Sequence, residues 1–199
     1  MLNKYNCKVI SGRGSRATRM QVMRLLAPIL VVAALLAGCR ERASYSVIRE
    51  GGWGGTPPAP AAAVLLTLIA PGGQSYDLDR AGIERLTWVR RITRHHPREN
   101  DPPAVFEGVL LSQLVRELGI DTDGLLVRFT ALDDYRIDRP WAELAPLEPV
   151  LALVQDGSPL TVKNYGPVRV VLPYERLRPD PTRYNALWVW QVRVIEFHY

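Results

Sequence analysis

The sequence has 199 residues, of which 47% are hydrophobic and 23% are charged. This length accommodates one ordinary domain of about 100–150 residues together with appended segments. The formal net charge of +5 would suit a binder of nucleic acid or membrane surfaces, but six basic residues and no acidic residue lie in residues 1–38. Removing those six charges from +5 leaves −1 for the rest of the chain, so the composition excludes a basic nucleic-acid-binding domain.

Residues 1–38 have the pattern of a bacterial lipoprotein signal peptide. Arg19 and Arg24 precede an apolar run at residues 25–36, which at about 12 residues is shorter than the roughly 20 residues that span a bilayer. Leu36-Ala37-Gly38-Cys39 then resembles a lipobox, where the chain is cut before the cysteine and the cysteine receives a lipid. The open alternatives are an uncleaved membrane anchor and a core helix with an incidental cysteine.

Lipidation of Cys39 would place the chain at a membrane, facing the periplasm. Arg40 stands where an aspartate retains many lipoproteins in the inner membrane, so the outer membrane is expected. Either Met20 or Met23 could be the true start, since both lie close to the apolar run. Cys7 would be removed with the leader, so the mature chain would hold no free thiol for a disulfide or a metal ion.

Residues 39–63 follow the predicted cleavage site and are rich in glycine and proline. Four glycines lie within residues 51–55 and three prolines within residues 57–60. Such a composition disfavours a helix or a paired strand, and it predicts a tether between the lipid and a folded domain.

Residues 64–199 predict one α+β domain in which strands dominate and helices are few and short. Asp79 is expected to cap a short helix, and Asp156-Gly157 to make a tight turn. In the closing strand, Trp188, Trp190, Val192 and Val194 would alternate onto one face. The predicted elements are a hairpin at residues 64–79, helices at 79–86 and 109–119, strands at 87–94, 125–132, 150–155, 168–173 and 187–197, and a polar loop at 95–104.

Five segments in this order resemble the oxidoreductase molybdopterin-binding domain family, which has the sulfite oxidase fold. The resemblance implies a mixed α+β fold with a twisted sheet and a central pterin cleft. Enzymes of that family hold molybdenum through a cysteine thiolate on a loop after a strand, because a soft sulfur ligand suits this metal. The corresponding residues 87–100 contain no cysteine, so no metal ligand and no catalytic residue is carried over. The five segments are FEGVLLSQLVRELGI (106–120), ALDDY (131–135), VLALVQDGSPL (150–160), GPVRVVLPYE (166–175) and WVWQVRVIEF (188–197).

A basic cluster surrounds the loop where the family's cofactor would sit. In a cleft, its guanidinium groups would bind a small anion such as a phosphate, a sulfo-oxyanion or a carboxylate. The alternative is a solvated edge whose arginines pair with Glu99, Asp101 or Glu107. The two histidines are adjacent in sequence, a spacing that does not suit a two-histidine metal site. The candidate residues are Arg90, Arg94, His95, His96 and Arg98.

A second candidate cleft is expected after the strand at residues 125–132. Asp133 and Asp134 could act as acid and base, or they could bond the following backbone as turn formers. Tyr135 and Tyr184 could line a pocket beside them.

Three functions therefore compete. The first is a periplasm-facing lipoprotein that binds a small anion or a partner protein without molybdenum. The second is a molybdopterin-dependent oxidoreductase with non-cysteine metal ligation and a redox partner. The third is a structural envelope lipoprotein. None of the three involves nucleic acid.

Overall fold

The computed structural model describes residues 44–94, 102–174 and 184–199. The predictions about the leader and Cys39 lie outside the described residues. Within the described part of the chain, no helix is long and apolar enough to cross a membrane.

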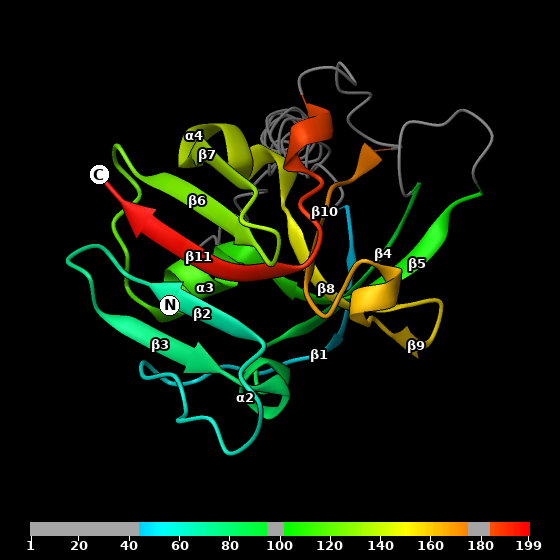
Figure 1. Ribbon diagram of the computed structural model, residues 1–199, viewed down its shortest axis with the longest axis horizontal. Coiled ribbons are helices and arrows are strands. Elements are labelled where there is room, and N and C mark those ends of the chain that lie inside the picture. The colour runs from blue at the N-terminus through cyan, green and yellow to red at the C-terminus, as the bar shows by residue number, and fades with distance from the viewer. Residues whose placement is uncertain (1–43, 95–101, 175–183) are drawn as a thin grey trace, which may run out of the picture. The chain divides into compact units, whose positions relative to one another are not determined.

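The described domain is built from two β-sheets and short helices (Figure 1). Its helices are α2 (Arg80–Glu84), α3 (Leu111–Glu117) and α4 (Trp141–Leu144), with 3-10 helices η2 (Ala145–Leu147), η3 (Val162–Asn164) and η4 (Asn185–Leu187). Its strands are β1 (Ser46–Arg49), β2 (Leu66–Ile69), β3 (Ser75–Leu78), β4 (Trp88–Thr93), β5 (Ala104–Leu110), β6 (Leu126–Ala131), β7 (Arg136–Pro140), β8 (Val150–Gln155), β9 (Ser158–Pro159), β10 (Arg169–Val171) and β11 (Val192–His198). The predicted α+β class is confirmed.

The first sheet has the order β1-β4-β5-β8-β10, with β9 paired to β8, and these pairs are antiparallel. The second sheet has the order β3-β2-β11-β6-β7, in which β2 and β11 run parallel and the other pairs are antiparallel. The closing strand β11 therefore lies in the middle of the second sheet, between the hairpin that opens this sheet and the β6–β7 hairpin (Figure 1).

One hydrophobic core joins the buried faces of both sheets. All three phenylalanines of the chain belong to it, and each is at most 1% exposed. Phe106 comes from β5 in the first sheet, and Phe129 and Phe197 come from β6 and β11 in the second. Because burying a large apolar side chain contributes about 1.5–3 kcal/mol, these rings are a major part of what holds the sheets together.

The opening hairpin and the helix after it form as the sequence predicts. β2 and β3 pair antiparallel, and Asp79 is the N-cap of α2. One carboxylate oxygen of Asp79 accepts from the Gly82 N–H at 2.7 Å, and the other accepts from the N–H groups of Ala61 and Ala62 at 2.8 and 3.0 Å. These backbone donors lower the pKa of Asp79 below its ordinary value.

The prediction that residues 39–63 hold no paired strand is wrong for β1. This strand pairs antiparallel with β4, and the residues around it are also bound to the domain. The Trp53 backbone N–H donates to Glu117 Oε2 at 2.8 Å, and its indole Nε1–H donates to the Gly82 carbonyl at 2.9 Å. Edge pairing of this kind depends on the partner strand, so local glycine and proline content gives no sign of it.

The helix predicted from residue 109 begins later, at Leu111, because Val109 and Leu110 end strand β5. The sequence prediction leaves residues 105–108 unassigned between the loop and the helix. Gly108 lies at an irregularity in the β5–β8 pairing. A Cβ at this position would lie 2.0 Å from the Leu151 carbonyl oxygen. The glycine is therefore required by the close approach of β8.

The predicted alternation along the closing strand is also wrong before residue 192. Trp188 is buried but Trp190 is 38% exposed, and regular strand structure starts only at Val192. A register shift between Val192 and Val194 then moves the inward positions to Ile195 and Phe197. Gln191, with φ of +54°, separates the two segments.

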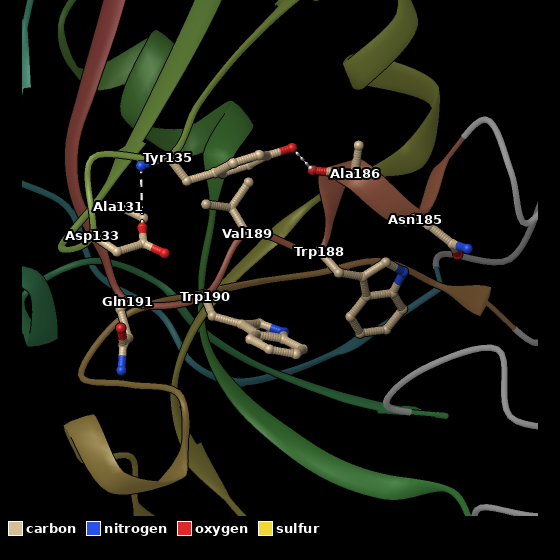
Figure 2. A pocket seen from close by; sticks show the side chains of 9 residues that line it. All are labelled: Ala131, Asp133, Tyr135, Asn185, Ala186, Trp188, Val189, Trp190 and Gln191. Atoms are coloured by element: carbon tan, nitrogen blue, oxygen red, sulfur yellow. Dashed lines mark hydrogen bonds between the residues drawn. The ribbon is translucent and has the colours of Figure 1, made fainter.

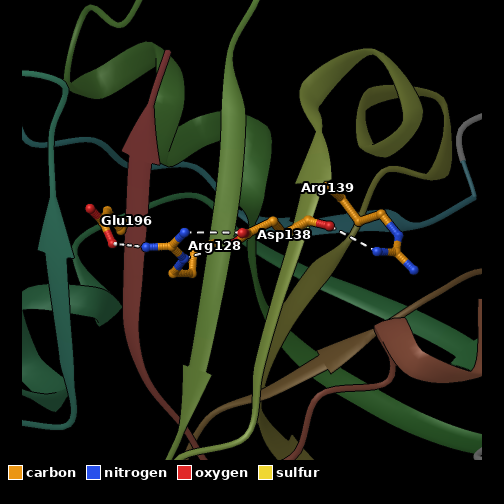
Figure 3. A network of polar contacts seen from close by, with 4 residues as sticks. All are labelled: Arg128, Asp138, Arg139 and Glu196. Carbon is orange, nitrogen blue, oxygen red and sulfur yellow. Dashed lines mark hydrogen bonds and ion pairs between the residues drawn. The ribbon is translucent and has the colours of Figure 1, made fainter.

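The outer face of the second sheet carries a cross-strand ion-pair network (Figure 3). Arg128 on β6 makes two contacts with the Asp138 carboxylate on β7, at 2.7 and 3.0 Å, and one with Glu196 on β11 at 3.3 Å. The pairing raises the pKa of Arg128 and lowers that of Asp138. Arg139 donates to the Asp138 backbone carbonyl at 2.8 Å. Such exposed pairs fix strand register more than they add stability.

Candidate functional site

A pocket of about 250 Å³ opens where the β6–β7 turn meets η4 and the segment that leads into β11 (Figure 2). Its walls combine aromatic rings with one carboxylate and two side-chain amides. The residues that line it are Ala131, Asp133, Tyr135, Asn185, Ala186, Trp188, Val189, Trp190 and Gln191.

The β6–β7 turn supplies the acidic side of the pocket. Asp133 Oδ1 accepts the Tyr135 backbone N–H at 3.1 Å, which is the turn-forming role that the sequence offered as one alternative. Its other carboxylate oxygen makes no described contact. The Tyr135 hydroxyl donates to the Ala186 carbonyl at 3.2 Å and so joins the turn to η4 (Figure 2).

Gln191 holds three segments together at the mouth of the pocket. Its side-chain Nε2–H donates to the Val162 carbonyl at 2.9 Å, and its backbone N–H donates to the Tyr165 carbonyl at 3.2 Å. Its own carbonyl accepts the Leu132 N–H at 2.9 Å. Gln191, Tyr165 and the neighbouring Asp134 all have positive φ values, a concentration of backbone strain that is typical of functional sites.

Behind the aromatic wall lies Arg169, a fully buried residue on β10 that the sequence analysis did not single out. Its guanidinium carbon lies 5.5–5.8 Å from the centroids of four aromatic rings. Burial lowers the pKa of Arg169 to about 10, while the neighbouring Tyr165 acts in the opposite direction, so the group stays charged at neutral pH. The sequence feature that could have identified Arg169 is its position inside the apolar run VRVVLP (168–173). The four rings belong to Phe106, Tyr165, Trp188 and Trp190, of which the two tryptophans also line the pocket.

The structure brings together only part of the second candidate cleft. Asp133 and Tyr135 line the pocket, whereas the Asp134 carboxylate pairs with Arg193 outside it. Tyr184 is half-buried and packs against the core next to η4 without lining the pocket.

The described residues of the basic cluster do not line the pocket. Arg90 is exposed and its guanidinium contacts Glu107 at 2.8 Å, as the solvated-edge alternative proposes. Arg94 is half-buried just after β4, and neither residue lines the pocket. His95, His96 and Arg98 lie outside the described residues. Arg91, which points to the other face of β4, is buried and donates to the carbonyls of Val171 and Glu148 at 2.9 and 2.7 Å.

Comparison with known structures identifies the fold class. The chain is similar to the sulfane dehydrogenase SoxCD from Paracoccus pantotrophus, with a TM-score of 0.50 and 15% sequence identity. The similarity covers 67% of this chain and 37% of that one, so this chain spans little more than a third of its relative's length. The expected sulfite oxidase-like fold is confirmed.

A family model matches part of the sequence. Residues 97–176 match the family model described as the oxidoreductase molybdopterin binding domain. The resemblance to this family that the motifs predict is confirmed over these residues. A comparison with curated proteins finds no match.

The residues present do not fit a molybdenum centre of the family's usual kind. No cysteine follows Cys39 in the sequence, so the domain offers no soft thiolate. At the end of β4, the Thr93 hydroxyl donates to the Leu172 carbonyl at 3.1 Å and accepts the Tyr174 N–H at 3.0 Å, so it is already engaged. Among the described residues, no group of three or more histidine, cysteine or acidic side chains is placed to bind a metal ion.

The pocket is small for a ligand site. Sites for drug-sized ligands usually enclose about 300–1,000 Å³. At about 250 Å³, this pocket lies just below that range.

Proposed function

We propose that this protein is a binding module without catalytic activity, and that its pocket takes the planar heterocycle of a pterin-type ligand without molybdenum. The observation that carries the proposal is a pocket walled by Trp188 and Trp190 and edged by the Asp133 carboxylate, in a domain whose sequence lacks the metal-binding cysteine. A flat ring can stack on the indole of Trp190, which is 38% exposed, and such a contact contributes about 0.5–1.5 kcal/mol beyond burial.

The hydrogen-bonding groups of the pocket favour a ligand whose ring edge carries N–H donors. Asp133 uses one carboxylate oxygen within its own turn and has a second available as an acceptor. Asn185 and Gln191 add amide groups on the rim. An aminopyrimidinone edge, as in a pterin, presents adjacent N–H groups that suit a carboxylate acceptor.

A small anion is a weaker candidate ligand for this site. Arg90 is occupied by Glu107, and Arg91 is occupied by backbone carbonyls. A molybdopterin oxidoreductase is favoured by the family match alone, and its metal would need a ligand other than cysteine. A purely structural envelope protein would leave the pocket without a ligand.

We further propose that the domain is held on a membrane by a lipid on Cys39 and faces the periplasm, with the outer membrane favoured by Arg40. The support is the basic flank, short apolar run and lipobox-like residues of the sequence. Export in this form would make the binding module an accessory to a protein or redox partner in the envelope.

Binding is tested by titrating the purified full chain with a panel of pterins and oxyanions, following thermal shift and tryptophan fluorescence. A ligand that binds only the folded state raises its stability by RT ln(1 + [L]/Kd), so a pterin should raise Tm progressively as its concentration increases. Asp133→Asn should weaken this response at least about tenfold, which corresponds to loss of one charge-assisted hydrogen bond. Asp156→Asn, in a turn away from the pocket, serves as the matched control.

Metal analysis of protein purified from its native envelope separates the two ligand proposals. Pterin without molybdenum supports the binding module. One molybdenum per chain would overturn it in favour of the oxidoreductase, and no response to pterins at millimolar concentration would favour the structural role.

A further inference from the structure

Strand β7 lies at one end of the second sheet and, among the described residues, pairs only with β6. The two strands run antiparallel in a constant register. At one end of this ladder, the Ala131 N–H donates to the Tyr135 carbonyl at 2.9 Å. At the other end, the Trp141 N–H donates to the Leu125 carbonyl at 2.8 Å. Because hydrogen-bonded positions alternate along an antiparallel pair, these two bonds fix which residues of β7 turn their backbone groups toward β6.

The even-numbered positions of β7 therefore turn their backbone groups away from β6. Arg136 and Asp138 each offer an N–H and a carbonyl on this side, whereas Pro140 offers only a carbonyl. Arg139 agrees with this direction, since its side chain extends away from β6 and donates to the Asp138 carbonyl at 2.8 Å (Figure 3). The edge of the sheet thus presents a row of backbone donors and acceptors, which is a template for pairing with another chain.

The exposed side chains of β7 match their own copy in one register. If two copies of β7 pair antiparallel about a twofold axis normal to the sheet, residues that lie opposite each other belong to the same face. With Ile137 on the axis, Arg136 of each copy lies opposite Asp138 of the other, which makes two pairs of opposite charge. With the axis at residue 136 or 138, two arginines or two aspartates would lie opposite each other, which is destabilising. The Asp138 side chain is 46% exposed although it pairs with Arg128, so it can accept a second cation.

The same register also satisfies the backbone of the edge. Arg136 and Asp138 are the residues with outward N–H groups, so each opposite pair can exchange both of its N–H···O bonds. Arg139 would give up its bond to the Asp138 carbonyl and would then lie opposite Tyr135 of the other copy, whose side chain is 43% exposed. A guanidinium beside an aromatic ring is a favourable contact. Because Tyr135 lines the pocket, each copy would place a positive charge next to the pocket of the other.

We propose that the partner of β7 is a second copy of this chain, paired edge to edge about an axis at Ile137, so that the two five-stranded sheets form one continuous sheet. The strands at two other sheet ends do not offer this match. β1 contains no acidic residue and β3 contains no basic residue, so neither can set opposite charges against its own copy. Pairing through β7 does not depend on which ligand the pocket binds.

Sedimentation velocity of the purified full chain at about 1–100 µM tests the pairing, since this range covers interfaces of micromolar affinity. The parent chain should form dimers as its concentration rises. Arg136→Asp or Asp138→Arg sets like charges against each other in both pairs, so each variant should weaken the dimer about tenfold or more. An equimolar mixture of the two variants restores opposite charges in both pairs of a mixed dimer and should dimerise about as well as the parent. Arg85→Asp makes the same change of charge at an exposed position at the end of α2, and it is the matched control.

Amide hydrogen exchange gives a second measurement that needs no variant. The N–H groups of Arg136 and Asp138 should gain protection as the protein concentration rises, while the Ile137 N–H, which faces β6, should be protected throughout. If Asp138→Arg does not fold, this measurement decides the question alone.

Three results would overturn the proposal. The first is a monomer at every concentration. The second is a dimer that folded Arg136→Asp and Asp138→Arg leave unchanged, or one that their mixture does not restore. The third is protection of the β7 edge that appears only when other envelope proteins are added, which would identify a different partner.

Discussion

Replacing Gln191 tests whether backbone strain and side-chain bonding shape the mouth of the pocket. Gln191 adopts φ of +54° and donates from Nε2 to the Val162 carbonyl at 2.9 Å. Either Gln191→Ala or Gln191→Gly removes that hydrogen bond, at a cost of about 0.5–1.5 kcal/mol. Glycine relieves the left-handed conformation, which costs an L-residue about 1–2 kcal/mol, whereas alanine retains it.

The free energy of unfolding of Gln191→Gly should therefore exceed that of Gln191→Ala by about 1 kcal/mol, after the larger unfolded-state entropy of glycine is subtracted. Urea denaturation followed by tryptophan fluorescence measures the difference. Both variants should bind a pterin more weakly than the parent, because both release the segment around Val162 from the rim. Equal stability of the two variants, or lower stability of the glycine variant, would refute the assigned backbone strain.

Three further changes probe the framework around the site. Gly108→Ala should destabilise the domain by about 1–3 kcal/mol or more in urea denaturation, since its Cβ would lie 2.0 Å from the Leu151 carbonyl oxygen; unchanged stability would contradict the close approach of β8. Asp79→Asn should lower Tm at neutral pH and flatten the acid limb of the stability curve. The depressed pKa of Asp79 gives stability that is complete above its ordinary pKa of 3.8 and lost as pH falls through the lower folded value, so an unchanged acid limb would contradict this role. Trp53→Ala should speed amide hydrogen exchange in β1 while leaving exchange in β8 unchanged, and equal acceleration in both would show that residues 44–53 do not open separately.

The parts of the fold that the sequence predicts correctly are those fixed by nearby residues. The β2–β3 hairpin follows from a run rich in β-forming residues and from the glycines between its strands. The cap of α2 follows from Asp79 alone. The turn at Asp156 and Gly157 follows from residues that tolerate positive φ, and both adopt it, at +50° and +76°.

The parts that the sequence misses depend on partners far along the chain. β1 is stabilised by pairing with a strand about 40 residues later, and nothing within its own glycine- and proline-rich surroundings indicates this. The pocket joins the turn at Asp133 to Trp188, and local pattern does not reveal that these segments meet. Arg169 was visible as a charge within an apolar strand, but its aromatic surroundings come from three other parts of the chain.

The absence of a metal-binding cysteine has no bearing on the proposed ring binding, because metal ligation and ring binding depend on different physical interactions. Molybdenum ligation in this family requires a thiolate at one defined position. Here β4 ends in Thr93, whose hydroxyl is hydrogen-bonded to the backbone of Leu172 and Tyr174, just after β10. The proposed ring binding requires only a stacking surface and an edge acceptor, which Trp190 and Asp133 would supply from segments that do not include β4. The proposed ring binding therefore does not require a metal-binding cysteine. The match to the family model ends at residue 176, so the pocket residues 185–191 lie outside it.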